Sequence, residues 1–415
     1  MLKRPAKNPA KKAANLPAEL RDGGEDASRM EPMVITSENA ARRDLEEKAI
    51  ELVKRSTNLH AGLPPGLRQP LVEFIRSMNC YYSNLIEGHD THPVDIERAL
   101  NGEYSAEPKK RNLQLEAKAH IAVQRWIDEG GLEERETQVS GILELHRRFT
   151  DLLPAELRWV ENPETKERIE VRPGEFRVRD AKVGRHIAIS PGAVPRFMLQ
   201  FEARYSRLTS LEAIVSSGAS HHRLLYIHPF ADGNGRVTRL MSYAVLRRVV
   251  GTGGLWSIAR GLARNEATYK QHLASCDDPR QGDRDGRGNL SEAALSGFCT
   301  FFLDVCLDQV AFMASVMQPK LLGDRIGAWA EEEARLGQLP QQAGRLLAAI
   351  LFQGAVARAD VPGIIDKSER SARDLTKALS RTGIIASDTA KGPWRLAFPA
   401  ALAPRLTPGL FPDRK

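Results

Sequence analysis

Apolar residues recur three and four positions apart along most of the chain, which is the spacing of α-helices that bury one face. This spacing predicts helices over 40–58, 66–87, 93–100, 110–129, 137–152, 263–274 and 295–316. Two further apolar runs, one ending near residue 227 and one starting near residue 237, enclose a short glycine-rich loop. The pattern predicts a mainly α-helical fold.

The spacing of apolar residues is different between Gly174 and Pro191. Residues 175–179 alternate between polar and apolar side chains, and residues 186–189 read as extended, with a turn at Gly184-Arg185 between them. A short β-hairpin is predicted here. Its alternation places Ile187 and Ile189 on one face.

At 415 residues, the chain is long enough for two or three domains. Residues 1–30 are basic, lack an apolar period and are expected to be a disordered tail. We expect an N-terminal helical region over 31–135, a helical core over 136–320, and a last domain over 341–415. The net charge of +7 is concentrated in the tail and in the last domain. Any binding to polyanions is therefore expected at the ends.

Four cysteines form no CxxC pair, so we expect them to be reduced and buried. No run of 18 apolar residues occurs, which argues against a membrane span. The basic N-terminus lacks the apolar stretch of a signal peptide. A cytoplasmic location is expected.

The loop between the two central helices holds a candidate base and a candidate metal ligand. His228 titrates near neutral pH and can take a proton from a hydroxyl group. Asp232 offers one hard oxygen, which suits Mg²⁺ that is held mainly by phosphates.

The same loop has the features of an anion site. The backbone amides of Gly233, Asn234, Gly235 and Arg236 would point out of a helix N-terminus, where the helix dipole favours an anion. Arg236 and Arg239 are three residues apart, so both can reach a polyphosphate from one face. These residues together predict a nucleotide-phosphate site with its own base.

The run His-Pro-Phe-Ala-Asp-Gly-Asn-Gly-Arg-Val-Thr-Arg from His228 to Arg239 resembles the Fic motif, HPFx(D/E)GNGRxxR, at every defined position. The resemblance implies a Fic helical core that transfers AMP from ATP, with Mg²⁺, to a protein hydroxyl. The related Doc branch phosphorylates its target and carries lysine where this chain has Gly235. Glycine at this position favours adenylylation.

A second motif lies upstream, in the last turn of the helix predicted over 66–87. The segment from Ser83 to Gly88 resembles the family's inhibitory motif, [S/T]xxxE[G/N], in its N-terminal (class II) position. By this resemblance, Glu87 pairs with Arg239 and keeps that arginine from the ATP γ-phosphate. The alternative is that Glu87 is an ordinary solvated acid at a helix end.

The resemblance also assigns roles to residues outside the two motifs. The hairpin resembles the Fic flap, whose edge pairs with an extended target segment, although a purely structural hairpin stays open. The flap residues expected to position the target are Val183, Gly184, His186, Ile187 and Ile189. Asn265 and Tyr269 fall where the family lines its nucleobase pocket.

Several other histidines have simpler interpretations. His120 and His146 lie in apolar helices and are expected to pack in the core. A zinc site built from His221, His222 and His228 is conceivable but is not favoured, because no HExxH or matching second ligand set occurs.

Residues 341–415 predict three helices followed by two short strands, an order that resembles a winged helix. The third helix carries a stripe of basic side chains that could reach phosphates: Arg370, Arg373, Lys377 and Arg381. Glu369 and Asp374 interrupt the stripe. Contact with a protein partner or a second copy of the chain is favoured, and DNA binding and structural packing remain alternatives.

The sequence as a whole favours an autoinhibited protein adenylyltransferase whose target supplies a Ser, Thr or Tyr hydroxyl, with self-modification expected. Two alternatives remain open. One is removal of AMP from a modified protein at the same site, with Glu87 activating a water. The other is a DNA-binding regulator that senses nucleotide without turnover, although a pure sensor needs no base such as His228.

Overall fold

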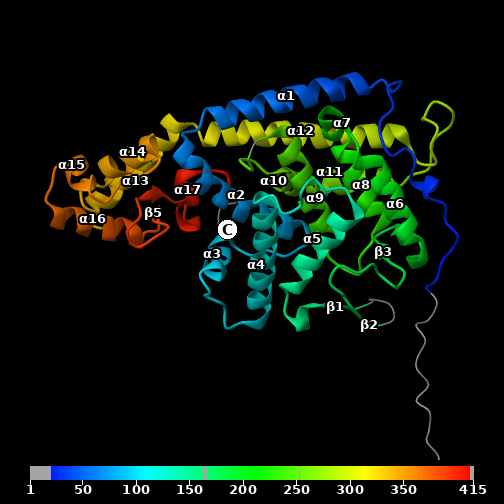
Figure 1. Cartoon of the computed structure of the whole chain (residues 1–415), viewed down its shortest axis with the longest axis horizontal. Helices are drawn as coiled ribbons and strands as arrows, with labels where there is room; N and C mark the ends of the chain where they lie inside the picture. The colour runs from blue at the N-terminus through cyan, green and yellow to red at the C-terminus, as the bar shows by residue number, and fades with distance from the viewer. Residues whose placement is uncertain (1–19, 162–165, 252, 412–415) are drawn as a thin grey trace, which may run out of the picture.

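The mainly α-helical fold predicted from the apolar spacing is confirmed (Figure 1). The structure is a computed structural model that describes residues 20–161, 166–251 and 253–411. Residues 1–19 of the predicted tail lie outside the described residues.

Twelve of the α-helices in the described ranges lie between residues 42 and 316. They are α1 (Arg42–Ala61), α2 (Pro65–Ile86), α3 (Pro93–Leu100), α4 (Pro108–Asp128), α5 (Val139–Asp151), α6 (Val194–Tyr205), α7 (Ser210–Val215), α8 (Ser217–Ile227), α9 (Asn234–Val250), α10 (Ile258–Arg264), α11 (Glu266–Ser275) and α12 (Glu292–Val316). The described part of the chain also contains four short 3₁₀ helices, η1 (Ala27–Met30), η2 (Ala155–Leu157), η3 (Pro191–Ala193) and η4 (Ala400–Leu402).

Helix α12 forms the long axis of the core, and α1 lies alongside it (Figure 1). Helix α12 is long and apolar enough to cross a membrane, and no other helix among the described residues is. It also packs against α8 and α10, and buries Phe298, Phe302 and Cys306. Its apolar composition therefore matches its place in the protein core. All four cysteines are buried and unpaired.

The prediction that disorder extends to residue 30 is wrong for residues 20–30, because this mostly exposed segment is anchored to the rest of the protein at Glu25 and Met30. The Glu25 carboxylate accepts hydrogen bonds from the backbone N–H of Ser190, at 2.8 Å, and from its hydroxyl, at 2.6 Å. Met30 is completely buried. The polar composition of this segment hid these two anchors, which bind to parts of the chain that are distant in sequence.

The strands are shorter than the alternation suggests and lie partly at other residues. A hairpin is present, in which β3 (Lys182–Val183) pairs antiparallel with β4 (His186–Ile187), but residues 175–179 form no strand. Arg177 in that segment instead turns its side chain inward and is buried. A second hairpin, β1 (Trp159–Glu161) with β2 (Arg168–Glu170), was not predicted.

The C-terminal module follows the predicted order of three helices and two strands, preceded by a long helix. Its elements are α13 (Pro319–Arg335), α14 (Ala343–Gln353), α15 (Val361–Ile365), α16 (Glu369–Arg381), β5 (Ile385–Ala386), β6 (Arg395–Leu396) and α17 (Ala403–Leu406). Strands β5 and β6 pair antiparallel, and Val356 forms an isolated bridge with Trp394.

The chain returns from this module to the helical body, where the last described residues lie beside α2 (Figure 1). The rings of Phe398 and Phe411 pack on Phe74 of α2, and their centroids lie 5.6 and 5.8 Å from the Phe74 centroid. The Tyr82 hydroxyl donates a 2.8 Å hydrogen bond to the carbonyl of Leu410. The last described residues thus cover α2, the helix at whose end Glu87 lies, while α17 also packs on α13 of the module.

Candidate functional site

His228 is held in a strained backbone conformation at the end of α8. Its φ of 50° and ψ of 62° are left-handed, which is uncommon outside glycine and is maintained here by hydrogen bonds. Its N–H donates to the Leu224 carbonyl at 3.1 Å, and its own carbonyl accepts from Arg177 Nε at 2.7 Å. Arg177 Nη2 also donates to the Ile189 carbonyl at 2.5 Å, so one buried arginine joins the loop to the base of the flap.

Burial, together with the nearby cations Arg177 and His186, lowers the pKa of His228 to about 4. The imidazole is therefore neutral at neutral pH, with a lone pair that can accept a proton. The sequence did not identify Arg177 as the residue that holds this loop, because it appeared as one position in a predicted strand.

The loop then closes on itself before α9 begins. The side chain of Asn234 accepts from the N–H of Phe230 at 2.9 Å and donates to the carbonyl of the same residue at 2.8 Å. Gly233 precedes it with a φ of 79°, a conformation that glycine adopts without steric cost. The Asn234 side chain thus shapes the loop, which leaves backbone amides at the start of α9 to face an anion.

Arg239 is bound by both predicted residues of the upstream motif. Its Nε donates to Ser83 Oγ at 2.9 Å and its Nη2 donates to Glu87 Oε1 at 2.5 Å, across 152 residues of sequence. Nη2 also donates to the Ser83 carbonyl at 3.0 Å. Burial by itself would raise the pKa of Glu87, but the Arg239 guanidinium outweighs it and holds the pKa below its usual value. The carboxylate is therefore ionised while it occupies this arginine.

Gly235 makes room for that carboxylate. A Cβ added at this position would collide with Glu87 Oε1 and come within 3.1 Å of Arg239 Nη1. Any larger side chain at position 235 would therefore compete with Glu87 for the same space.

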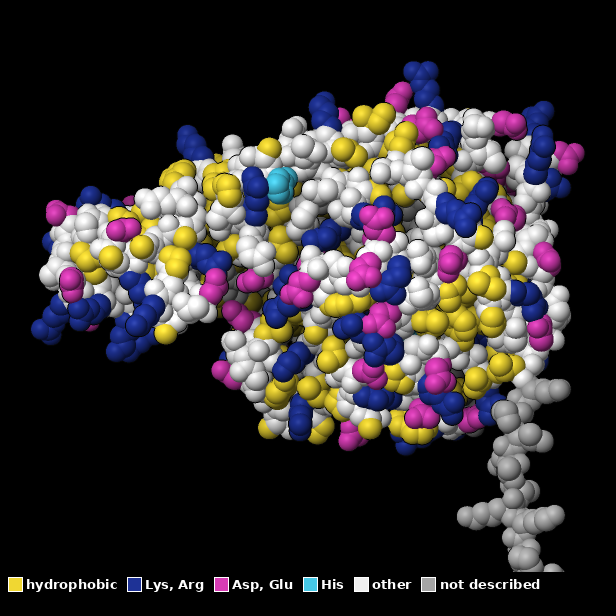
Figure 2. Space-filling model, viewed as in Figure 1, with side chains coloured by type: hydrophobic (Ala, Val, Ile, Leu, Met, Phe, Trp, Pro, Cys, Tyr) yellow, Lys and Arg dark blue, Asp and Glu magenta, His cyan; other side chains and the backbone are white. Residues whose placement is uncertain are grey.

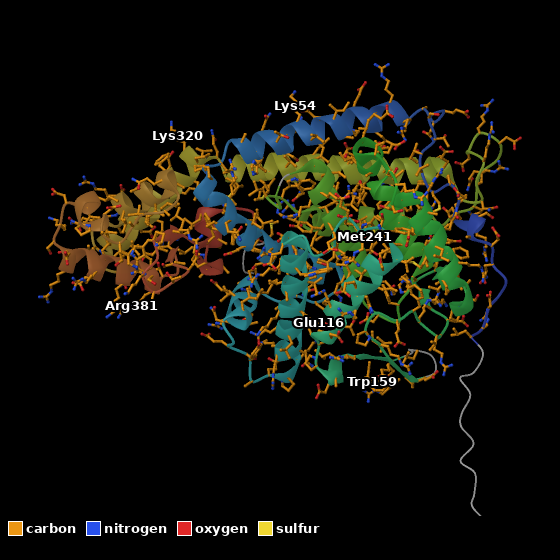
Figure 3. All side chains as sticks on the ribbon, in the orientation of Figure 1. Lys54, Glu116, Trp159, Met241, Lys320 and Arg381 are labelled. Carbon is orange, nitrogen blue, oxygen red and sulfur yellow. The ribbon has the colours of Figure 1, made fainter. Side chains whose placement is uncertain are left out.

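Arg236 has a carboxylate partner that the sequence did not reveal. Its Nη1 lies 2.9 Å from Glu116 Oε1 on α4; the Arg236 side chain is buried and that of Glu116 is mostly buried. The other Glu116 oxygen lies 2.7 Å from His89 Nδ1, just beyond the upstream motif. Arg236 Nη2 lies 3.6 Å from the partly exposed Asp232 carboxylate. Figure 3 marks Glu116 in the body of the molecule, far from Arg381 in the C-terminal module.

The other histidines near the loop are structural. His120 is completely buried, which lowers its pKa to about 3. His146 stacks on Phe230, with ring centroids 3.8 Å apart. His221 lies 2.8 Å from Ser242 Oγ and 2.6 Å from Tyr269 Oη. Among the described residues, no group of three or more His, Cys, Asp or Glu could hold a metal ion.

The two residues assigned to the nucleobase pocket are placed differently. Tyr269 is buried with its hydroxyl on His221, whereas Asn265 is exposed and its amide donates to the Gly261 carbonyl at 2.9 Å. Their assignment to a nucleobase stays a prediction.

The flap presents only part of the predicted target-binding face. Ile187 is 76% exposed and Val183 is 52% exposed, with the turn at Gly184 (φ 58°) between the strands. Ile189, however, is only 4% exposed, so the prediction that it shares a clamp with Ile187 is wrong. The strand ends at Ile187, and the backbone of Ile189 is bound by Arg177, which turns the side chain into the core.

Comparison with known proteins agrees with this geometry. The family model of the Fic/DOC family matches residues 137–246, which include the whole loop. Two relatives named "Protein adenylyltransferase Fic", from Drosophila erecta and Drosophila willistoni, are 27% and 28% identical over 170 and 172 residues. Each match covers 40% of this chain and 31% of the relative, so the chain spans about a third of their length.

The fold is similar to that of a Fic family protein from Desulfovibrio desulfuricans G20. That crystal structure is 18% identical in sequence, with a TM-score of 0.51, and the match covers 88% of this chain and 98% of the other. The fold and the loop thus define a helical protein in which the N-terminus of α9 lies beside a neutral histidine. Residues 137–246 are thus similar to the Fic/DOC family in sequence, and the fold around them is similar to that of a Fic family protein.

Proposed function

We propose that this protein is an autoinhibited protein adenylyltransferase that moves AMP from ATP to a protein hydroxyl. The observation that carries the proposal is the Ser83–Glu87–Arg239 cluster built against the loop of His228. A carboxylate that occupies a buried arginine in an anion site has the arrangement expected of an inhibitor of phosphate binding.

In the reaction, neutral His228 takes the proton from the target hydroxyl. The hydroxyl oxygen then forms a bond to the α-phosphorus of ATP, and the bond from that phosphorus to the bridging oxygen breaks, which releases pyrophosphate. The amides at the start of α9 and the Arg236 guanidinium stabilise negative charge on the transferred group. The flap edge at Val183 and Ile187 holds the target segment by strand addition.

Mg²⁺ fits this site only as an ion that is shared with ATP. Asp232 is a single, partly exposed carboxylate at the loop, which suits a cation that is held mainly by phosphates. When bound, Mg²⁺ would neutralise charge on the phosphates.

We call the Ser83–Glu87–Arg239 cluster the lock, and it controls how ATP is oriented in the site. While Glu87 holds Arg239, that guanidinium is unavailable to the γ-phosphate, and ATP cannot settle with its α-phosphate beside His228. Release of Glu87 frees one arginine that is already fixed in position by Ser83.

Intact-mass spectrometry after incubation with ATP and Mg²⁺ tests the proposal. The Glu87→Gly form is expected to gain the mass of AMP, and the wild type to gain much less. A gain of phosphate mass would instead indicate a kinase reaction, and no gain in either form would overturn the proposal unless a separate protein target is modified.

Removal of AMP at the same site is the second candidate. Only Oε1 of Glu87 is bonded to Arg239, and the side chain is 32% exposed, so its other oxygen can orient a water. Incubation of AMP-modified protein with wild type and Glu87→Gln, followed by mass spectrometry, separates the two activities. Removal by the wild type alone would favour this candidate.

The protein target and the C-terminal module complete the proposal. The target supplies a Ser, Thr or Tyr hydroxyl, and self-modification serves as the first assay. We assign the module to a protein partner or a second copy of the chain, with DNA binding not favoured, and we place the protein in the cytoplasm.

A further inference from the structure

The flap is attached to the helical body through one histidine. His186, on β4, points its ring away from the exposed edge that carries Ile187. Its Nε2 lies 2.9 Å from the carbonyl oxygen of Tyr226 on α8, and its Nδ1 lies 3.1 Å from Oδ2 of Asp277, just after α11. Both contacts are made to parts of the chain outside the hairpin.

Both ring nitrogens of His186 face hydrogen-bond acceptors. A neutral imidazole carries a single N–H, so one of the two contacts would then place a nitrogen lone pair against an oxygen. An imidazolium carries two N–H groups and satisfies both contacts. The geometry therefore requires the charged form of His186.

His222, the second histidine near Asp277, must instead be neutral. His222 Nδ1 lies 2.7 Å from the guanidinium Nη1 of Arg223, which can only donate, so Nδ1 must accept. His222 Nε2 lies 3.1 Å from the Leu273 carbonyl and 3.2 Å from Asp277 Oδ1, so it donates. His222 is therefore neutral, and the single negative charge of Asp277 is paired with His186.

We propose that His186, in its charged form, is a positioning residue that fastens the flap to α8 and to Asp277, so that the target-binding edge loosens when His186 loses its proton. The consequence for target binding rests on the proposed function of the flap. The attachment itself does not depend on that function.

The charges around His186 support this assignment. Burial by itself would lower the pKa of His186, but its hydrogen bond and charge interaction with Asp277 raise it above the ordinary value, against the opposing charge of Arg177. Burial lowers the pKa of His222 to about 4 and that of His228 to about 4, so neither carries a competing charge at neutral pH. Because the folded-state pKa of His186 is raised, the attachment is complete below the ordinary histidine value and is lost as the pH rises through the raised value.

Hydrogen exchange of the flap and a histidine titration test the proposal. The first readout is the NMR titration of His186 in the full chain. The second is exchange at Ile187 and at Ala188, whose N–H donates to the Ala181 carbonyl at 3.1 Å and closes the flap. His186→Gln cannot titrate and serves as the reference that cancels the intrinsic pH dependence of exchange.

We expect His186 to titrate above 6.5 in the wild type, and Asp277→Asn to lower that value. Relative to His186→Gln, exchange in the wild type should quicken by about tenfold or more as the pH rises through the titration, because a hydrogen bond to a charged group is lost. Asp278→Asn, the neighbouring exposed acid, is the matched control and should change neither readout.

Titration of His186 at or below 6.5 would overturn the proposal. So would equal pH dependence of exchange in wild type and His186→Gln. Because both readouts are made without ATP, they stand or fall separately from AMP transfer. If Asp277→Asn does not fold, wild type and His186→Gln still decide the question.

Discussion

Helices α9 and α16 both carry arginines three residues apart, yet the two pairs have opposite surroundings. Arg236 and Arg239 on α9 are each only 4% exposed and are paired with Glu116 and Glu87 from other helices. On α16, Arg373 has a side chain that is 78% exposed and pairs only with Glu369 one turn away. The basic side chains of the C-terminal module project from its lower edge in Figure 2.

The comparison shows that the spacing of charges does not determine what they do. Breaking a buried ion pair leaves an uncompensated charge and costs several kcal/mol, on the order of 3–5, whereas an exposed pair contributes about 0–1 kcal/mol. The α9 arginines can therefore work as a switch, since a partner carboxylate changes their availability. The α16 arginines are already available to solvent and to any partner.

The largest expected effect is at His228, the base beside the Glu87–Arg239 pair. His228→Ala in the Glu87→Gly form should lower self-modification by about 10²–10⁴-fold while leaving ATP affinity nearly unchanged. The pKa of about 4 predicts that the Glu87→Gly form keeps its activity down to mildly acidic pH and loses it as the pH falls toward that value. Rapid modification by the His228→Ala form would remove His228 from the role of base.

Release of the lock is the second prediction. Glu87→Gly should raise self-modification on the order of 10²-fold, because it removes a charged hydrogen bond to a buried arginine, which is worth about 1.5–3 kcal/mol. Arg239→Ala in the Glu87→Gly form should reverse most of the gain. Equal rates in wild type and Glu87→Gly, measured with labelled ATP, would show that the pair does not control activity.

Gly235→Ala sharpens the same comparison without removing a charge. The added methyl group competes with the Glu87 carboxylate for space, so self-modification should rise by about tenfold, which is less than in Glu87→Gly. Gly363→Ala is the matched control, because a Cβ there meets nothing within 4 Å. If Gly235→Ala lowers activity in both the wild-type and the Glu87→Gly background, the methyl group obstructs ATP rather than the lock.

The lock should also change stability with pH. The folded-state pKa of Glu87 is depressed, so its contribution is present above its unfolded pKa and is lost as the pH falls through the folded value. Chemical denaturation should therefore show that the free energy of unfolding of the wild type exceeds that of Glu87→Gln by about 1–3 kcal/mol at neutral pH. This gap should close in acid. A gap that is constant with pH would mean that Glu87 is not ionised in the lock.

The smallest effects are expected on α16. Replacing Arg370, Arg373, Lys377 and Arg381 with alanine should change stability by no more than about 0.5 kcal/mol and leave self-modification unchanged. If these residues do bind a DNA duplex, four phosphate contacts make the logarithm of the binding constant fall with the logarithm of the salt concentration, with a slope of roughly −3.6. A steep slope with submicromolar affinity on random duplex, lost in the alanine form, would establish DNA as the partner.

The sequence by itself determined the features that are local. Periodic apolar positions specify the helices because each helix needs one buried face, and the glycines with Asn234 specify the loop because its contacts span four residues. The resemblance to the family's two motifs also predicted that Glu87 pairs with Arg239 and placed Ser83 in the inhibitory motif. The short hairpin was less well predicted, since two-residue strands carry little alternation.

Only the tertiary structure decided which distant groups meet. Glu116 reaches Arg236 from a helix with no motif of its own, and Ile189 is buried next to the backbone contact that Arg177 makes with it. The charged state of His186 likewise depends on acceptors at residues 226 and 277, which lie far along the chain. Burial and pairing of polar groups depend on the whole packing arrangement, and no local pattern in the sequence encodes it.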